Sequence, residues 1–177
     1  MHSTEKATEI AKKIKLLILD IDGVLTDGGI YFDDTGKELK KFNSLDGHGI
    51  KMLLSSGIEV GVITARSTSS VSYRLKDLGV KHYYHGISDK SITLTELTDK
   101  LSIELSQVCY VGDDVIDLTV MTKVALPIAV ANAHSFVKEH SILVSKKCGG
   151  SGAVREVCDF LLKSQGKYDA LMESYLK

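Results

Sequence analysis

The sequence predicts an α/β fold in which a mostly parallel central sheet lies between two layers of helices, as in Rossmann-like three-layer sandwiches. Short apolar runs rich in β-branched residues alternate with longer helical patterns along the chain. These runs are apolar on both faces, as in parallel strands that helices cover from two sides. The chain has 177 residues, which suits one domain over 1–177 with a sizeable core.

The elements follow one another in a regular order. The predicted strands span residues 15–20, 59–64, 81–84, 107–111, 124–130 and 141–145. The predicted helices span residues 46–56, 68–78, 89–101, 114–122 and 151–165. Gly57 and Gly79 stand where two of these helices are expected to end, just before the next strand.

One segment departs from this alternation. Residues 29–42, GIYFDDTGKELKKF, alternate in polarity around a DDTG turn, which predicts a β-hairpin flap. The segment is too short for a separate domain, and a helix and a strand fill the chain between Thr64 and Lys90. The sequence therefore predicts a fold with no cap domain over its ligand site.

Bulk composition excludes several function classes. The formal net charge is −1, so no global charge attracts nucleic acid or an anionic membrane. The N-terminal stretch has no apolar run of signal-peptide length, and the run LLIL ends at an aspartate. Three cysteines without a C-x-x-C pair favour a reducing compartment. We therefore expect a cytoplasmic protein with a small-molecule partner.

Polar residues follow the predicted strands at the edge where open α/β sheets bind ligands. Asp20 and Asp22 come after the first strand, Thr64 after the second, and the acidic stretch 113–117 after the fourth. Lys90 opens the helix between the third and fourth strands. Converging carboxylates repel one another unless a cation lies among them, and oxygen ligands of this kind suit Mg²⁺.

The D-x-D pair indicates a covalent phosphoryl transfer. Asp20 can attack phosphorus and form an aspartyl phosphate. Asp22 can protonate the leaving oxygen and then activate water, while its backbone carbonyl completes the metal shell. Thr64 can donate to a phosphate oxygen, and Lys90 can neutralise the charge that develops on the transferring group.

Each motif taken alone has a simpler explanation. A single D-x-D at a strand end is usually turn chemistry, a threonine there often caps the next helix, and a lysine at a helix start is usually solvated. The ordered set of DIDG, Thr64, Lys90 and GDDVID, each at its expected position, favours catalysis.

These segments resemble a known family. LLILDIDGVLTDG, VITAR, Lys90 and VGDDVIDLTVM are similar to the four motifs of the haloacid dehalogenase superfamily of aspartate-based phosphatases. Within it, DGVLTDG, the hairpin, FN-x-x-DG-x-G, GG-x-GAVREVCD and the QGK tail resemble the phosphatases of 3-deoxy-D-manno-octulosonate 8-phosphate, which serve lipopolysaccharide biosynthesis. The resemblance covers roughly residues 12–169.

The resemblance implies a role for each matching residue. The implied catalytic residues are Asp20, Asp22, Thr64 and Lys90, and the implied Mg²⁺ ligands are Asp20, Asp22 and Asp113. The implied contacts with a sugar-acid phosphate are Asp22, Asn43, Ser44, Leu45, Asp46, Gly47, Lys51, Arg66, Arg74 and Lys90. Asp114 and Asp117 are expected to support metal-bound water or Lys90 from behind.

The chain departs from the family pattern at three positions. Leu45 stands where members often carry a basic residue, Lys51 where they often carry arginine, and Ala65 where they often carry glycine. Lysine does not reproduce the bidentate grip of arginine on a carboxylate. A related nine-carbon sugar-acid phosphate therefore stays open as the substrate. Arg66 and Arg74 are expected along one helix, about 12 Å apart, so that they serve different groups.

Without a cap, cover for the site has to come from elsewhere. The resemblance implies a homotetramer in which hairpins meet at the centre and one subunit helps to close its neighbour's site. Ile30, Phe32 and Leu39 would form an exposed apolar patch on a monomer, unless they pack on the parent domain. The tail, about 166–177, either docks on a neighbour or frays. His48 and Arg155 lie near the expected site without an assigned role.

Two other classes use similar parts. A receiver domain of a signalling protein also has an aspartate, Mg²⁺, threonine and lysine, but its acidic pair comes first and its acceptor aspartate later. A non-catalytic regulatory domain would keep the fold and could lose Asp22 or Lys90, yet both are present. Motif order and completeness favour a Mg²⁺-dependent phosphatase.

Overall fold

Six parallel strands form the central sheet of the structure, a computed structural model that describes residues 2–177. Their order across the sheet is β5-β4-β1-β6-β7-β8, and each neighbouring pair is parallel. The strands are β1 (Leu16–Leu19), β4 (Glu59–Ile63), β5 (His82–Tyr84), β6 (Val108–Gly112), β7 (Leu126–Ala129) and β8 (Leu143–Val144). The predicted parallel sheet is confirmed.

The register of the central strands brings three strand ends to one level. Leu19 pairs with Val62 of β4 on one side and with Val111 of β6 on the other. All four residues of β1 are buried, because helices cover both faces of the sheet. Asp20, which directly follows β1, therefore lies beside the last residues of β4 and β6. Thr64 and Asp113 follow those two strands, so they lie close to Asp20.

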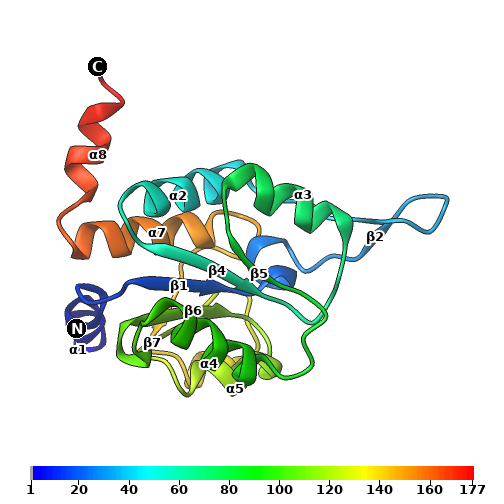
Figure 1. Ribbon diagram of the computed structural model, residues 1–177, viewed down its shortest axis with the longest axis horizontal. Helices are drawn as coiled ribbons and strands as arrows, with labels where there is room; N and C mark the ends of the chain where they lie inside the picture. Colours follow the sequence, from blue (N-terminus) through cyan, green and yellow to red (C-terminus); the bar gives the residue numbers. More distant parts are fainter. Residues whose placement is uncertain (1) are drawn as a thin grey trace.

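Two layers of helices enclose the sheet (Figure 1). One layer holds α2 (Ser44–Ser55), α3 (Ser69–Leu78) and α7 (Ala153–Ser164), and the other holds α4 (Lys90–Leu101), α5 (Leu118–Met121) and α6 (Ser135–Glu139). The α7 helix turns Val154, Val157 and Leu161 into the core, an i, i+3, i+7 stripe that suits burial of one face. The three-layer prediction is confirmed.

Most predicted elements match within two residues, and the differences lie in short segments. The predicted helix 114–122 is a 3₁₀ turn over Val115–Asp117 followed by α5. Three helices were not predicted: α1 (His2–Ala11), α6, and α8 (Tyr168–Ser174), which lies within the tail. They are short or bury few large side chains, so their apolar periodicity is weak.

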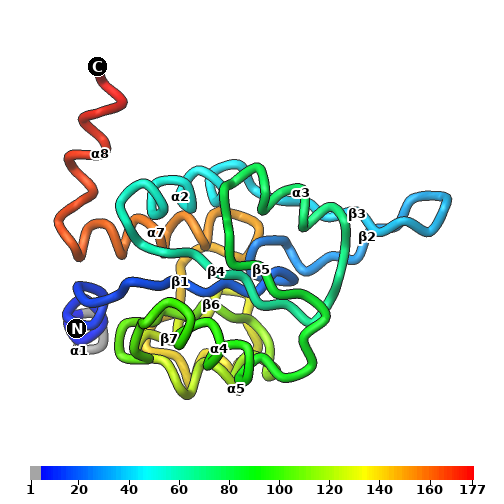
Figure 2. The backbone as a smooth tube through the Cα atoms, in the orientation of Figure 1, coloured from blue at the N-terminus to red at the C-terminus, as the bar shows by residue number. Residues whose placement is uncertain are grey.

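The predicted hairpin is present and projects from the body of the molecule (Figure 2). Strands β2 (Tyr31–Phe32) and β3 (Glu38–Leu39) pair antiparallel across a turn. Ile30 is 56% exposed and Phe32 61% exposed, so the alternative that these side chains pack on the parent domain is wrong. Between β1 and β4 the described chain holds a loop, this hairpin and α2, with no room for a cap. No helix among residues 2–177 is long and apolar enough to cross a membrane.

Candidate active site

A tight loop after β1 holds the two aspartates of the D-x-D motif. Asp20 is buried, and its backbone N–H donates to the Val111 carbonyl, which fixes it to β6. The chain then makes a tight turn over Ile21–Leu25, in which Asp22 and Gly23 have non-helical backbone angles. Thr26 closes this turn: its hydroxyl donates to the Ile21 carbonyl and accepts from the backbone N–H of Gly23. Thr26 thus keeps both aspartates at the end of β1.

Gly23 allows a third carboxylate to approach the loop. Its φ is +90°, a conformation that favours glycine. A Cβ at this position would lie 2.0 Å from Oδ2 of Asp113, the first residue after β6. The absence of a side chain at Gly23 is therefore a condition for the approach of Asp113 to the loop that bears Asp20.

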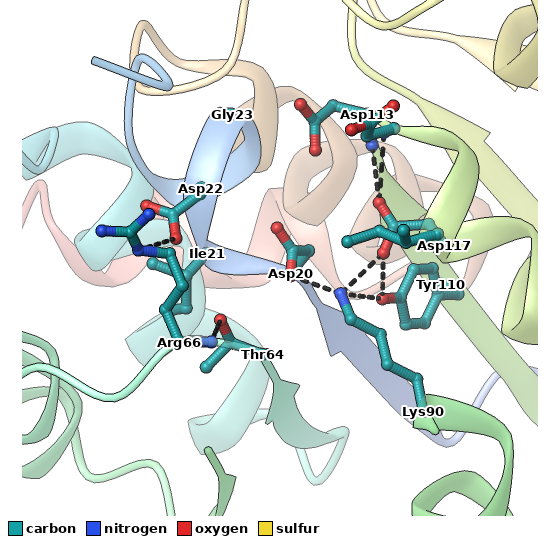
Figure 3. A network of polar contacts seen from close by, with 12 residues as sticks. Asp20, Ile21, Asp22, Gly23, Thr64, Arg66, Lys90, Tyr110, Asp113 and Asp117 are labelled. Carbon is teal, nitrogen blue, oxygen red and sulfur yellow. Dashed lines mark hydrogen bonds and ion pairs between the residues drawn. The ribbon is translucent and has the colours of Figure 1, made fainter. Parts of the chain in front are cut away.

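Lys90 extends from the first residue of α4 into the same cluster (Figure 3). Its side chain is 3% exposed, and Nζ lies 2.5 Å from Oδ1 of Asp20 and 2.8 Å from Oδ1 of Asp117. Nζ also lies 3.3 Å from the hydroxyl oxygen of Tyr110. The alternative of a solvated lysine at a helix start is therefore wrong.

Asp117 is fully buried and satisfies four donors at once. Oδ1 accepts from Lys90 and, at 2.7 Å, from the Tyr110 hydroxyl. Oδ2 accepts from the backbone N–H groups of Asp113 at 3.0 Å and Asp114 at 3.3 Å. Asp117 thus orients Lys90 and shapes the Asp113 loop, in agreement with the predicted support of Lys90. The polar role of the Tyr110 hydroxyl is not predicted from the sequence, because a tyrosine within an apolar run is typical of a hydrophobic core.

Asp20 and Asp113 hold their protons more tightly than isolated carboxyl groups do. Burial, followed by the charge of Asp117, raises the pKa of Asp20 to about 7, although Lys90 opposes the shift. Burial, followed by the charges of Asp20 and Asp117, raises the pKa of Asp113 to about 8. One oxygen from each of Asp20, Asp113 and Asp117 lies within 4.8 Å of the others. A cation among them would relieve this repulsion.

Thr64 directly follows β4 and is buried. Its hydroxyl oxygen accepts from the Arg66 backbone N–H at 3.3 Å, so it orders the turn after β4. The helix that follows begins later, with Thr68 at its N-cap position. The alternative of Thr64 as a helix cap is therefore wrong, and Arg66 lies before α3 instead of on one helix with Arg74.

The carboxylate of Asp22 points away from Asp20 and towards Arg66 (Figure 3). Arg66 Nε lies 3.8 Å from Oδ2 of Asp22, and Lys40 from the hairpin contacts Oδ1. Glu38 contacts both cations, at 2.7 Å from Lys40 and 2.9 Å from Arg66. Lys40 and Glu38 were missed, because alternating charges on a hairpin are typical of a solvated strand.

The predicted substrate stretch 43–47 begins α2 and divides into two groups. Asn43 is the N-cap: its Oδ1 accepts from the Leu45 N–H at 2.8 Å. Ser44 and Leu45 are exposed at the start of the helix. Asp46 is instead buried and accepts from the N–H groups of Gly152 and Arg155 at the start of α7. Asp46 therefore joins α2 to α7.

The remaining predicted contacts lie on the outer surface of α2 and α3. Lys51 is exposed. Arg74 pairs with Asp77 at 3.0 Å and covers Gly47, where a Cβ would lie 2.1 Å from Nη2 of Arg74. The ring of His48 lies 5.4 Å from that of Tyr175, beside the tail. These residues are not part of the buried carboxylate cluster.

A glycine-rich loop before α7 packs against the D-x-D loop that follows β1. A Cβ at Gly149 would lie 1.7 Å from the Gly23 carbonyl oxygen, and the Gly150 N–H donates to the Val24 carbonyl. The Arg155 side chain pairs with Asp159 at 2.8 Å, which leaves it as an ion pair on α7. The GG-x-GAVRE motif is therefore a structural support of the site.

Comparisons with known proteins agree with this geometry. Residues 84–156 match the family model of haloacid dehalogenase-like hydrolases. The chain is 52% identical, over 90% of its length and 85% of the relative, to the 3-deoxy-D-manno-octulosonate 8-phosphate phosphatase of Escherichia coli K12. The chain belongs to this phosphatase family.

Solved structures of the 3-deoxy-D-manno-octulosonate 8-phosphate (KDO 8-phosphate) phosphatase family superpose closely. A Moraxella catarrhalis member, crystallised with a magnesium ion, a phosphate ion and KDO, has a TM-score of 0.94 and 41% identity, and the match covers 97% of this chain and 98% of the other. A probable YrbI family phosphatase from Pseudomonas syringae has a TM-score of 0.96 and 45% identity over 98% of each chain. The family resemblance predicted from the motifs is confirmed.

Proposed function

We propose that the protein is a Mg²⁺-dependent phosphatase that hydrolyses KDO 8-phosphate to KDO and phosphate through an aspartyl phosphate on Asp20. The observation that carries this proposal is the position of Asp20. It is a buried carboxylate held by Lys90 on one side and adjacent to the acidic loop of Asp113 on the other. The relatives named KDO 8-phosphate phosphatases support the substrate.

The donor set fits Mg²⁺. Burial, followed by the charges of neighbouring carboxylates, raises the pKa values of Asp20 and Asp113, and a divalent cation would offset both causes. The oxygens of Asp117 already accept from Lys90, Tyr110 and two backbone N–H groups, so we do not place it in the metal shell. Asp20, Asp113 and the backbone carbonyl of Asp22 would hold the ion. A bound Mg²⁺ supplies positive charge that stabilises the phosphoryl oxygens.

In the first half of the reaction, a carboxylate oxygen of Asp20 attacks phosphorus. Lys90 binds the other oxygen of Asp20 and balances negative charge on the transferring group. The bond from phosphorus to the sugar oxygen breaks, and that oxygen takes a proton from the Asp22 carboxyl. The product is the free sugar acid and an aspartyl phosphate.

In the second half, the Asp22 carboxylate takes a proton from a water molecule as the water attacks phosphorus. The bond between phosphorus and the Asp20 oxygen breaks, which restores the Asp20 carboxylate and releases phosphate. The Thr64 hydroxyl and backbone N–H groups of the loop can donate to the phosphoryl oxygens during both steps.

Recognition of the sugar acid falls to residues around the mouth of the site. Arg66 is our main candidate for the substrate carboxylate, because its guanidinium lies beside Asp22 and is 44% exposed. Asn43, Ser44, Leu45 and Lys51 remain candidates for the sugar hydroxyls. We assign Asp46 and Gly47 to packing between helices, and Arg74 to the neighbouring surface, where a second subunit could use it.

A homotetramer would cover the site in the absence of a cap. The exposed apolar side chains of the hairpin support an interface: Ile30, Tyr31, Phe32 and Leu39. The tail presents Leu176, which is largely exposed, and could dock on a neighbour. We also propose a cytoplasmic location, which the free cysteines at 109, 148 and 158 support.

Phosphate release from a panel of phosphorylated eight- and nine-carbon ulosonic acids and hexoses tests the proposal. We expect Mg²⁺-dependent turnover with a strong preference for KDO 8-phosphate, and loss of phosphate release in Asp20→Asn with the fold retained. Preference for a nine-carbon acid would replace the substrate and leave the mechanism intact. An active Asp20→Asn, or a preference for hexose phosphates, would contradict the proposal. A receiver-like domain would instead accumulate phosphoprotein without turnover.

A further inference from the structure

Two acidic and two basic side chains form a closed ring between the hairpin, the D-x-D loop that follows β1 and the turn that follows β4. Asp22 and Glu38 are its acids, and Lys40 and Arg66 are its bases. Oδ1 of Asp22 contacts Lys40 and Oδ2 faces Arg66, while Oε1 of Glu38 contacts Lys40 and Oε2 contacts Arg66. Each carboxylate therefore uses both of its oxygens, one on each cation. We call these four residues the charge ring.

Lys40 is the most enclosed member of the charge ring. Its side chain is 1% exposed, although it comes from a hairpin whose apolar side chains face solvent. A buried ammonium loses its hydration and persists only with closely placed acidic partners. Asp22 and Glu38 are those partners, so the position of Lys40 fixes the position of the Asp22 oxygen that it contacts.

Arg66 holds Asp22 less firmly. Its guanidinium is 44% exposed, and its distance to Oδ2 of Asp22 is 3.8 Å, beyond that of a hydrogen bond. Arg66 is also the residue that we propose for the substrate carboxylate, so it can leave Asp22 when substrate binds. Lys40 then remains as the main partner of the Asp22 side chain.

We propose, on the basis of the function proposed above, that Lys40 is a positioning residue that holds the Asp22 carboxyl group at the leaving-group side of the site. Proton transfer to the sugar oxygen and from the attacking water depends steeply on the placement of Asp22. Lys40 provides this placement from the hairpin, and Glu38 in turn holds Lys40. The hairpin is thus a direct support of the acid/base residue.

The neighbouring lysine offers a matched control. Lys41 follows Lys40 on the same segment, but its side chain is 69% exposed and pairs with Asp27 at 3.4 Å. Both lysines carry the same charge and occupy the same hairpin. Comparison of Lys40→Met with Lys41→Met therefore separates loss of the contact with Asp22 from a general change in hairpin charge.

Two substrates with different leaving groups test the proposal on the Mg²⁺-loaded enzyme. An alkyl phosphate such as KDO 8-phosphate needs a proton on its leaving oxygen, whereas p-nitrophenyl phosphate releases a stable phenolate. For Lys40→Met we expect kcat on KDO 8-phosphate to fall by about 10–100-fold, part of the usual contribution of a general acid. For cleavage of p-nitrophenyl phosphate, we expect the rate of the single-turnover burst of p-nitrophenolate to fall by less than about 3-fold.

Further variants complete the design. Lys40→Arg should restore part of the lost rate, Lys41→Met should match the wild type, and Lys40→Met should add little to Asp22→Asn. Glu38→Gln keeps Lys40 and removes one of its acidic partners, so it should lower kcat on KDO 8-phosphate selectively, but by less than Lys40→Met does. If Lys40→Met does not fold, Glu38→Gln replaces it in the test.

The outcomes separate this proposal from the one on which it rests. An equal loss on both substrates, no loss, or the same loss in Lys41→Met would overturn the positioning role of Lys40. In those cases a selective loss in Asp22→Asn would still support Asp22 as the acid. If Asp22→Asn itself keeps full activity on KDO 8-phosphate, the acid/base assignment in the proposed function fails instead.

Discussion

The buried cluster around Asp117 and the charge ring around Lys40 differ in how the fold holds them. The cluster joins four buried side chains: Asp20 directly after β1, Lys90 at the start of α4, Tyr110 within β6 and Asp117 in the 3₁₀ turn that follows β6. The charge ring joins two loops to a projecting hairpin, and Arg66 within it remains partly exposed. The difference indicates that Asp20, the proposed nucleophile, is fixed by the core, whereas Asp22, the proposed acid/base residue, is held by the projecting hairpin.

This contrast suits the two tasks. The nucleophile has to meet the same phosphoryl group in every substrate, so a rigid setting in the core is favourable. In the proposed mechanism the acid/base residue acts on the leaving group, which is the variable part of the substrate, and its partner Arg66 is partly exposed.

Removal of Asp117 should have the largest effect. Asp117→Ala would leave the buried Lys90, the Tyr110 hydroxyl and two loop N–H groups without their shared acceptor. We expect a loss of about 3–5 kcal/mol in the free energy of unfolding, the usual cost of breaking a buried ion pair. We also expect phosphatase activity to fall at least about 100-fold, because Lys90 and Asp113 lose their orientation. Urea unfolding and phosphate release measure the two effects.

Asp114 provides the control within the same motif. It is exposed, and its side chain accepts from the Val115 N–H at 2.7 Å as part of the capping box of the short turn. Asp114→Ala should therefore cost only about 1 kcal/mol. Equal losses in the two variants would contradict the view that Asp117 organises the cluster.

The sequence predicts the buried cluster far better than the charge ring. Asp20, Thr64, Lys90 and Asp113 each directly follow a strand or open a helix, so sheet topology alone brings them to one edge. The sequence does not predict Tyr110 as a member of the cluster, because its hydroxyl donates to Asp117 from within a strand whose residues are all buried. The sequence does not predict the burial of Lys40 either, because no local pattern shows which of the several charged side chains of the hairpin is buried.

Side-chain direction also explains the differences at the predicted substrate residues. Asp46 is on the first turn of α2, where a carboxylate was expected to face ligand, but it turns to the N-terminus of α7. Arg66 was expected on a helix, yet the helix begins only at Ser69. Such choices depend on contacts between distant segments, which spacing along the chain does not encode.

Metal removal should affect the stability of the buried cluster in a pH-dependent way. The pKa values of Asp20 and Asp113 rise from 3.8 to about 7 and about 8 in the folded protein without metal. A raised carboxyl pKa means that the folded state binds protons more tightly than the unfolded state does. The contribution of these two carboxyl groups to the free energy of unfolding is fully present below pH 3.8. It is lost as the pH rises to about 8. In EDTA, we therefore expect the contribution of this cluster to Tm to fall between pH 5 and 8.

Added Mg²⁺ should reverse this trend, because it binds the ionised carboxylates and stabilises the folded state. The increase in Tm on Mg²⁺ addition should be larger at pH 8 than at pH 5, by several degrees. Asp113→Asn should raise the Tm in EDTA at pH 8 and reduce the response to Mg²⁺. A Mg²⁺ effect that is independent of pH would contradict carboxylate repulsion as the cause.

Weakening of the charge ring should have the smallest effect on stability. Glu38→Gln leaves Asp22 as an acidic partner of the enclosed Lys40. The pair that is lost on the Arg66 side is partly exposed, and such a pair contributes about 0.2–1 kcal/mol. We expect the free energy of unfolding to fall by no more than about 1 kcal/mol in urea titrations, well below the loss for Asp117→Ala. A loss of about 3 kcal/mol or more would mean that the ring is a folding element like the buried cluster. A small loss together with slower turnover of KDO 8-phosphate would instead fit a ring that orients Asp22 and adds little to the stability of the fold.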